Sequence, residues 1–478
     1  MASRGPQLLA GWGRASATAA RVSRPSDADE VAALFDLSGH DGAPTGMHGG
    51  LIARGLGRSY GDAAQCAGGV VVETARLGGI SWVDEAAGLV EVGAGVSMQE
   101  LMAWALPAGW FVPVTPGTRS VSVGGAIAAD IHGKNHHRDG SFCRHVTGCQ
   151  LVTPAGTWEI GPGRDQELFW ATAGGMGLTG VVTRATLRLI PVETTSMVVD
   201  TLRFDDLDAV MSAMEAGDRD HRYSVAWVDC SGRGRRLGRS VLTRGDHATR
   251  GDLQPGGGEP VRTAPGEPRV AVPFPAPGGV LNAVAVRAFN ELWFRLAPRH
   301  RAGAVQPLAS FFHPLDTVAR WNLLYGRRGF VQYQFVVPSH QGEAVRRAVT
   351  WIGASGLPSF LAVLKRFGPG SPGPLSFPIE GWTLALDFPI GPPGLPELLD
   401  RLDALVASSG GRVYLAKDSR LAPELLAVMY PRLSELASVR QRVDPSGRLR
   451  SDLSRRLGLD PAGAPTARRG NRGGHTYG

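Results

Sequence analysis

The sequence lacks the long apolar runs and the paired cysteines that define several classes of protein. No run approaches the roughly 20 apolar residues that cross a bilayer, and the segment from Met1 to Pro6 has no apolar core of the kind that directs secretion. The cysteines form no C-x-x-C pair and no metal-ligand pattern; they are Cys66, Cys143, Cys149 and Cys230. We therefore expect free structural thiols in a reducing compartment. The predicted location is cytoplasmic, with association with a membrane or a place at its periplasmic face as alternatives.

A pattern for nucleic-acid binding is also missing. The net charge of the chain is +7, and part of it lies in Arg468, Arg469 and Arg472 of the glycine-rich end. Nucleic-acid recognition needs a basic face with stacking aromatic residues or a recognised module, and the sequence has neither. The segment 461–478 has no apolar anchors, so we expect a disordered basic tail. The remaining positive charge suits an anionic substrate or a peripheral contact with acidic lipids.

The chain length and the order of strand signals predict two domains of the α+β class. With 478 residues, the chain is long enough for two cores. Strands and hairpins dominate up to Pro191, and residues 181 to 190 alternate cleanly between apolar and polar side chains. This order of elements differs from a repeat of β-α-β units. We expect a loose lead-in (1–16), a first domain (17–195), a second domain (196–410) with a mobile or disordered loop (232–279), a segment returning to the first domain (411–460) and the tail (461–478).

The most informative motif is a glycine-rich loop, Ala53 to Asp62, that follows the short apolar run Leu51-Ile52. Its glycines allow left-handed backbone conformations and a close approach to a ligand. Successive N–H groups in such a turn form a concavity that binds anions, and Arg54, Arg58 and Ser59 suit phosphate oxygens. The third glycine of G-x-G-x-x-G is missing and a strand follows at once, so a plain turn remains an alternative for this loop alone.

Two further blocks strengthen the interpretation of this loop. Pro116 to His137 is rich in small residues, so a flat ligand can lie against its backbone, and Gly174 to Gly180 adds a third glycine cluster. The three blocks together resemble the flavoproteins of the vanillyl-alcohol oxidase family, and the likeness runs from about Gly11 to Leu457. The resemblance implies a two-domain PCMH-type FAD-binding fold whose substrate domain is built on an antiparallel sheet. An unrelated glycine-rich α+β enzyme is the alternative.

The resemblance also implies which residues contact FAD. In the family, the first loop holds the pyrophosphate and the second block lies along the isoalloxazine ring. The implied contacts are Ala53, Arg54, Gly55, Leu56, Gly57, Arg58, Ser59, Tyr60, Gly61, Asp62, Gly117, Ser122, Val123, Gly124, Gly125, Ala129, Asp130, Ile131, His132, Val181 and Tyr414. Related alditol and aldonolactone oxidases often carry a flavin-linked histidine where this chain has Arg58, so we expect noncovalent FAD.

Lys417 is the predicted catalytic residue. Hydride transfer from a carbinol carbon to a flavin is easier when a base takes the hydroxyl proton, and burial lowers the pKa of a lysine toward that use. The resemblance places Lys417 at the substrate end of the flavin; a surface lysine paired with Asp418 is the alternative. His132 is the second candidate, as an orienting group. No carboxylates accompany His132, His136 and His137 at ligand spacing, so we predict no metal site.

The likeness is greatest to the branch of the family that oxidises a polyprenyl-phosphate ribose in cell-wall arabinan synthesis. It implies oxidation of the C2′ hydroxyl of decaprenylphosphoryl-β-D-ribose to a ketone, which a nicotinamide-dependent reductase partner then reduces, completing an epimerisation. Ala385 stands where mycobacterial members carry a cysteine, and Thr383 and Phe312 also depart from the family, which puts the identity of the sugar in doubt. The implied substrate contacts are Tyr60, Trp227, Gln332, Gln334, Lys365 and Ala385.

Individual substrate contacts have ordinary structural alternatives. Gln332 and Gln334 alternate on one strand face, and Lys365 could meet a substrate phosphate, but solvated faces explain each of them as well. Core packing explains Tyr60 and Trp227 equally. For the whole chain, the alternatives are an alditol, aldonolactone or other phospho-sugar FAD oxidase, or a flavin-binding scaffold without turnover.

Overall fold

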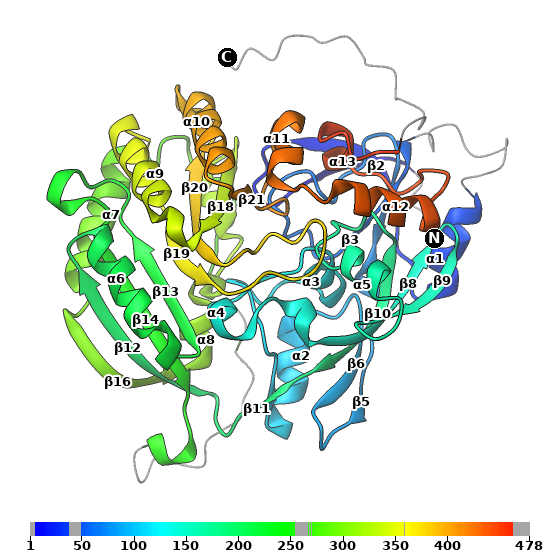
Figure 1. Cartoon of the computed structure of the whole chain (residues 1–478), viewed down its shortest axis with the longest axis horizontal. Helices are drawn as coiled ribbons and strands as arrows, with labels where there is room; N and C mark the ends of the chain where they lie inside the picture. Colours follow the sequence, from blue (N-terminus) through cyan, green and yellow to red (C-terminus); the bar gives the residue numbers. More distant parts are fainter. Residues whose placement is uncertain are drawn as a thin grey trace.

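The computed structural model describes residues 5–37, 49–253, 266, 268, 270–357 and 359–461. Within these residues the chain forms the predicted α+β fold, with three larger β-sheets. Figure 1 shows the green-to-orange sheet on one side, the blue and cyan strands on the other, and the last helices over the N-terminal strands. Those last helices are α11 (Pro423–Met429), α12 (Leu433–Val443) and α13 (Asp452–Arg456).

The first sheet is four-stranded and contains the strand that leads into the glycine-rich loop. Its order is β1 (Gln7–Ala10), β2 (Ala17–Ser23), β4 (Val70–Glu73), β3 (Leu51–Arg54). β4 runs parallel to both β2 and β3. The loose lead-in predicted for residues 1–16 was wrong for residues 7–10, because β1 pairs antiparallel with β2 and so satisfies its backbone groups. Helix α1 (Ala28–Leu37) follows β2 in the chain.

The second sheet is antiparallel and contains two hairpins, in line with the predicted dominance of strands and hairpins in this part of the chain. Its order is β5 (Ile80–Asp84), β6 (Leu89–Gly93), β10 (Val181–Arg188), β8 (Val146–Thr153), β9 (Gly156–Ile160). A capping box formed by Ser97 and Glu100 opens α2 (Met98–Ala105). Shorter elements complete this part: β7 (Trp110–Phe111), α3 (Val123–Ala128), α4 (His136–Asp139), α5 (Gln166–Thr172) and β11 (Ile190–Pro191).

The third sheet has eight strands, and every neighbouring pair is antiparallel, which confirms the predicted antiparallel sheet. Its order is β16 (His300–Pro307), β12 (Ser196–Phe204), β14 (Ser240–His247), β13 (Tyr223–Val228), β19 (Ala362–Phe367), β20 (Gly381–Pro389), β18 (Phe330–Pro338), β21 (Arg412–Val413). α6 (Leu207–Gly217), α9 (Gly342–Ser355) and α10 (Leu395–Ser408) pack against it. Near it lie α7 (Ala283–Leu296), α8 (Leu308–Phe312), β15 (Val270–Ala271) and β17 (Val318–Ala319).

The predicted loop over residues 232–279 was wrong in part, because it contains β14. This strand lies between β12 and β13; it pairs with β12 along its whole length and with β13 from Ser240 to Gly245. Glycine and arginine surround its short apolar segment, from Ser240 to Thr243, so the composition of the region hid a strand signal. Residues 254–265 of the predicted loop, and the predicted tail from residue 462 onward, lie outside the described residues.

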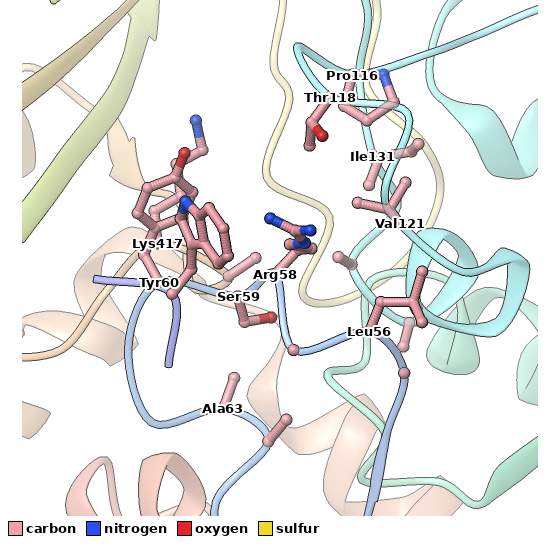
Figure 2. Close-up of a pocket in the computed structure, with 18 of the residues that line it drawn as sticks. Leu56, Arg58, Ser59, Tyr60, Ala63, Pro116, Thr118, Val121, Ile131 and Lys417 are labelled. Atoms are coloured by element: carbon pink, nitrogen blue, oxygen red, sulfur yellow. The ribbon is translucent and has the colours of Figure 1, made fainter. Parts of the chain in front are cut away.

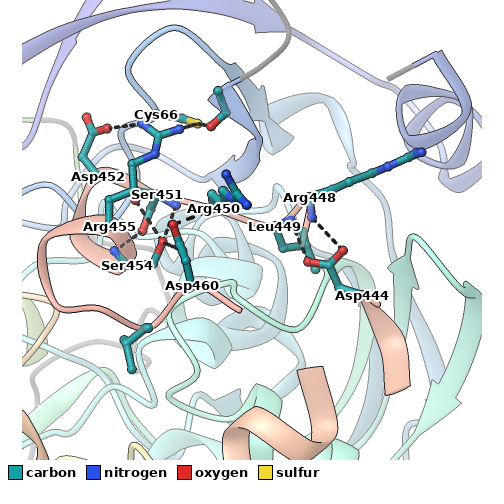
Figure 3. A network of polar contacts seen from close by, with 12 residues as sticks. Cys66, Asp444, Arg448, Leu449, Arg450, Ser451, Asp452, Ser454, Arg455 and Asp460 are labelled. Carbon is teal, nitrogen blue, oxygen red and sulfur yellow. Dashed lines mark hydrogen bonds and ion pairs between the residues drawn. The ribbon is translucent and has the colours of Figure 1, made fainter. Parts of the chain in front are cut away.

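A polar network holds the C-terminal segment against the first sheet (Figure 3). Leu51 N–H donates to the Arg448 carbonyl (2.7 Å), and Arg450 N–H donates back to the Leu51 carbonyl (2.9 Å), so the segment extends the sheet beside β3. The Asp444 carboxylate accepts N–H bonds from Arg448 and Leu449, each at 2.8 Å. Residues 444–451 therefore lie beside the strand that leads into the glycine loop. The domain boundaries themselves stay a prediction.

Candidate active site

A cavity of about 280 Å³ lies between the glycine-rich segments and the eight-stranded sheet. One wall consists of residues 53–64, 116–132 and 172–182; the other consists of β18, β19, β20 and the segment after β21. Figure 2 shows Leu56, Arg58 and Ser59 on the first wall and Lys417 above Tyr60 across from Val121 and Ile131. The cavity therefore brings together parts of the chain that are far apart in the sequence.

The first wall is a cradle of backbone groups. Among the described residues, the N–H groups of residues 55–59 donate no hydrogen bond, so they are free to bind an anion. A Cβ at Gly55 would lie 2.1 Å from Ser122 Oγ, which means that only glycine lets the two blocks approach this closely. Gly57 has φ +65°, a left-handed conformation that a side chain would strain.

The cradle fits a flat, anionic dinucleotide cofactor. A Cβ at Gly117 would have no atom within 4 Å, so the space beside this backbone is open cavity. The Arg58 guanidinium lies over the Trp12 ring, 3.8 Å from its centre, and its buried Nε has no hydrogen-bond partner in the described part of the chain. An orphaned guanidinium N–H beside free backbone N–H groups is the donor set that binds phosphate oxygens. The residues present therefore fit the pyrophosphate and ring of FAD.

Most predicted cofactor contacts line this cavity, and some do not. Those that line it are Ala53, Gly55, Leu56, Gly57, Arg58, Ser59, Tyr60, Gly117, Ser122, Gly124, Gly125, Ala129, Ile131, His132 and Tyr414. Those outside the lining are Arg54, Gly61, Asp62, Val123, Asp130 and Val181. The FAD contacts predicted for these six residues stay predictions, and the structure shows other contacts for several of their side chains.

The residues outside the lining hold the cradle in place. Arg54 donates to the Ala10 carbonyl at 2.8 Å and to that of Ala64 at 3.2 Å, so its guanidinium ties β1 to the loop instead of facing a phosphate. Asp130 is fully buried and accepts a 3.1 Å bond from the Cys143 N–H. Val123 and Val181 belong to the hydrophobic core. A Cβ on Gly61 would lie 1.9 Å from the Asp418 carbonyl, so this glycine permits close backbone packing.

Asp62 takes part in an ion-pair bridge that the sequence did not reveal. Arg456 of α13 binds both oxygens of Asp62 at 2.9 Å and binds Asp418 at 2.8 Å. The Tyr60 N–H donates to the Ala416 carbonyl at 2.9 Å. The loop and the residues on both sides of Lys417 are therefore fixed to each other. The ion pair of Asp418 goes to Arg456, which argues against the alternative in which Lys417 is a surface lysine paired with Asp418.

Lys417 reaches the cavity beside Tyr60, with its Nζ 5.5 Å from the centre of that ring. Burial lowers the pKa of Lys417 to about 8, although the nearby charge of Asp387 acts to raise it. At this pKa a minor fraction of the amine is unprotonated at neutral pH, and that fraction rises with pH and can accept a proton. The structure thus gives Lys417 the properties that a general base requires.

Asp387 is a site residue that the sequence analysis missed. It is fully buried on β20 and accepts hydrogen bonds from Gln332 Nε2 (2.5 Å) and from Tyr325 Oη (3.2 Å). Burial raises the pKa of Asp387 to about 6. The signal in the sequence is a lone acid in an otherwise apolar strand, since a buried carboxylate needs partners. Its charge is the one that acts on Lys417 in this wall.

His132 is held between two polar side chains. Its Nε2 lies 3.0 Å from Gln334 Nε2, and its Nδ1 lies 3.1 Å from Lys365 Nζ. Burial lowers the pKa of His132 well below its ordinary value, so the ring is neutral. Burial likewise lowers the pKa of Lys365 well below its ordinary value. A neutral amine can accept from Nδ1–H while the Gln334 amide donates to Nε2, which fixes the ring orientation.

The chain contains only three lysines, and all of them are enclosed in this region; they are Lys134, Lys365 and Lys417. Burial lowers the pKa of Lys134 to about 7, and its Nζ donates to the Phe311 carbonyl. Elsewhere the positive charge of the chain is carried by arginine, which is not deprotonated in proteins. Lysine therefore occurs only where a titratable amine is enclosed, a sequence signal that could have identified all three.

Most predicted substrate contacts also line the cavity, on adjacent strands of the third sheet. Tyr60, Gln332, Gln334, Lys365 and Ala385 do so. Trp227 lies outside the lining, one strand away as the cross-strand partner of the cavity residue Val363, and its contact with substrate stays a prediction. Other lining residues were not predicted: Trp12, Ala63, Ala64, Thr74, Pro116, Thr118, Val121, Ala128, Thr172, Met176, Gly177, Gly180, Val182, Leu315, Trp321, Leu361, Val363 and Ala416.

Comparisons with known proteins agree with this site. A family model described as an FAD binding domain matches residues 19–160. The chain is 43% identical over 454 residues to the decaprenylphosphoryl-beta-D-ribose oxidase of Mycolicibacterium smegmatis, covering 94% of this chain and 97% of that protein. It is 43% identical over 371 residues to an uncharacterised protein of Streptomyces coelicolor, covering 76% of this chain and all of that protein. A D-lactate dehydrogenase of Archaeoglobus fulgidus is 28% identical over 199 residues, 40% of this chain and 43% of that protein.

The fold and the cradle define a flavoprotein oxidoreductase with a two-domain PCMH-type α+β fold and FAD as its cofactor. Within that class, the chain belongs to the decaprenylphosphoryl-β-D-ribose oxidase family.

Proposed function

We propose that this enzyme oxidises the C2′ hydroxyl of decaprenylphosphoryl-β-D-ribose to a ketone. The proposal is supported by the name of the Mycolicibacterium smegmatis relative. The observation that carries it is Lys417, an amine with a pKa of about 8 that faces the FAD cradle across one cavity. This reaction is the first half of the epimerisation that yields the arabinose donor for cell-wall arabinan.

The cradle residues would hold the cofactor without a covalent bond. The N–H groups of residues 55–59 and the Arg58 guanidinium would bind the pyrophosphate, and the backbone at Gly117, Gly124 and Gly125 would lie along the ring. Bound FAD supplies the acceptor for the hydride that leaves the carbinol carbon. Arg58 is not a nucleophile, so we expect no flavin link through this loop.

The opposite wall would manage the proton and the orientation of the sugar. The neutral Lys417 amine would accept the C2′ hydroxyl proton, and the Asp387 carboxylate would stabilise the ammonium that forms. The buried oxygens Gln332 Oε1 and Gln334 Oε1 have no partner in the described part of the chain and would accept from sugar hydroxyls. His132 would orient the sugar through its fixed ring.

The keto sugar and the reduced flavin that this reaction forms must each react further. A keto sugar needs a nicotinamide-dependent reductase to become the epimer, so we propose such a protein as its partner. Reduced flavin needs oxygen or a quinone as acceptor. We expect the lipid chain of the substrate to bring the enzyme into peripheral contact with a membrane. Within the described residues, no helix has the length and apolar character to cross one.

The experiment that tests the proposal is anaerobic mixing of the purified flavoprotein with decaprenylphosphoryl-ribose. We expect the oxidised flavin absorbance to bleach, and Lys417→Ala to slow bleaching by about 10²–10⁴-fold while FAD stays bound. Soluble alditols and aldonolactones serve as the comparison substrates. Bleaching by these alone would favour the alditol or aldonolactone oxidases, and flavin that stays oxidised with every sugar would favour a scaffold without turnover.

A further inference from the structure

Helix α7 presents an apolar face to solvent. The buried residues Val286, Asn290 and Phe294 recur every four positions, so the helix contacts the protein along one narrow stripe. On other sides of the helix its large apolar side chains are exposed; they are Val284, Phe289, Leu292, Trp293 and Leu296. Phe289 and Trp293 stack with ring centres 6.1 Å apart. Exposed apolar patches of this kind mark interaction surfaces.

The same face is bordered by positive charge. Residues 283–301 contain four arginines and a single acid, Glu291. Glu291 forms ion pairs with Arg239 (2.7 Å) and Arg295 (2.5 Å), so its charge is already compensated. Arg287, Glu291 and Arg295 recur every four residues and therefore form one flank of the helix beside the apolar face. An apolar face with Trp and Phe beside an arginine-rich flank is typical of helices that lie in a membrane interface.

The apolar face continues toward the cavity. The Phe289 ring lies 5.0 Å from the Phe360 ring, and the next residue, Leu361, lines the cavity. Phe360 also contacts Tyr325, with ring centres 6.5 Å apart, and Tyr325 binds Asp387. Further exposed apolar residues, Phe274 and Val280, lie in the segment before α7. An apolar path thus joins the helix surface to the wall of the substrate cavity.

We propose that α7 lies flat on an acidic lipid surface and presents the cavity to a lipid-linked substrate in that surface. The inference rests on the proposed function, because a prenyl chain leaving the cavity would follow Phe360 and Phe289 into the lipid. Acidic headgroups attract the arginine flank, whereas a second copy of the chain would bring an equally positive helix against it. Figure 1 shows α7 at the left edge of the molecule, away from the N-terminal sheets.

The test is flotation of the FAD-loaded full chain with vesicles of phosphatidylcholine, with or without phosphatidylglycerol. We expect co-flotation with the acidic vesicles that weakens as salt rises. Leu292→Glu is the test variant and Val83→Glu the matched control, since both side chains are 58% exposed and Val83 lies on β5. We expect Leu292→Glu to weaken vesicle binding about tenfold or more and Val83→Glu to bind as the parent protein does.

A second measurement separates this inference from the proposed function. A water-soluble, short-chain prenylphosphoryl ribose should bleach the flavin of parent and Leu292→Glu protein at the same rate, while turnover of the long lipid in vesicles falls in the variant. Equal flotation of both variants would overturn the membrane surface and leave the oxidase intact. A dimer in solution that Leu292→Glu dissociates, without vesicle binding, would also overturn it. Vesicle binding without any bleaching would instead overturn the proposed function on which the inference rests.

Discussion

The two walls of the cavity consist of different chemical groups. The cradle wall uses backbone N–H groups and glycines, with Gly55 packed against Ser122 and Gly117 facing open space. The opposite wall uses buried side chains whose properties depend on neighbours, such as Lys417 near Asp387 and His132 between Gln334 and Lys365. Backbone groups bind the constant part of a cofactor, whereas side chains with shifted pKa values carry out chemistry. Changes to the first wall should therefore alter cofactor retention, and changes to the second should alter rate.

The largest effect is expected on the cradle. Gly117→Leu should fold normally but purify without flavin, because its Cβ would meet no protein atom and its side chain would occupy the space beside the backbone. The measurement is the flavin-to-protein absorbance ratio together with the unfolding temperature. Gly163→Leu is the matched control, since a Cβ there also has no atom within 4 Å and Gly163 lies outside the cavity lining. Full flavin content in Gly117→Leu would contradict the assignment of this wall.

On the opposite wall, Asp387→Asn should change the pH dependence of the rate. The base must be unprotonated, so flavin reduction in the parent enzyme should rise with pH through about 8. The Asp387 charge raises the pKa of Lys417, so its removal lowers that pKa, and the midpoint of the profile should move to lower pH by about one unit. Stopped-flow reduction from pH 6 to 10 measures this shift. Asp400→Asn, at an exposed position, should leave the profile unchanged, and a shift to higher pH would contradict the pairing.

Lys365→Met tests whether Lys365 acts by holding His132, as the structure suggests, or by contacting the substrate phosphate, as the sequence predicted. Because Lys365 lies 3.1 Å from His132 Nδ1, its loss should free the imidazole and lower the limiting reduction rate about tenfold. The apparent dissociation constant of the substrate should change less. If that constant rose while the limiting rate held, Lys365 would instead contact the substrate phosphate, as the sequence suggested. Both values come from one substrate titration under anaerobic conditions.

The smallest effect on turnover is expected at Ala385. This residue lines the cavity between Gln334 and Val363, its partners on the two neighbouring strands. Ala385→Cys adds a small side chain, so turnover should stay within about twofold. The native cysteines are buried, and burial raises the pKa of each of their thiols. One additional thiol should therefore react with a maleimide, and its protection by substrate would place it on the substrate wall; an unreactive thiol would contradict that placement.

Features of the cradle wall could be predicted from the sequence, whereas several features of the opposite wall could not. The glycine loop, the small-residue block and the hairpins were predictable because their signals are local. Asp387 was missed because its role depends on the register that sets it opposite Gln332 on β18. Trp227 was predicted as a substrate contact but lies outside the cavity lining, a position that depends on the strand order. β14 was missed because glycine and arginine surround its apolar segment.

The sequence by itself determined the backbone cradle, since glycine spacing dictates where a chain can turn and approach a ligand closely. It also confined lysine to three positions. Only the tertiary structure decided that these lysines share one enclosed region, that Arg456 fixes Asp62 to Asp418, and that α7 faces outward. The physical reason is that burial and charge coupling act through space, so a side chain acquires its pKa only when distant strands and helices enclose it.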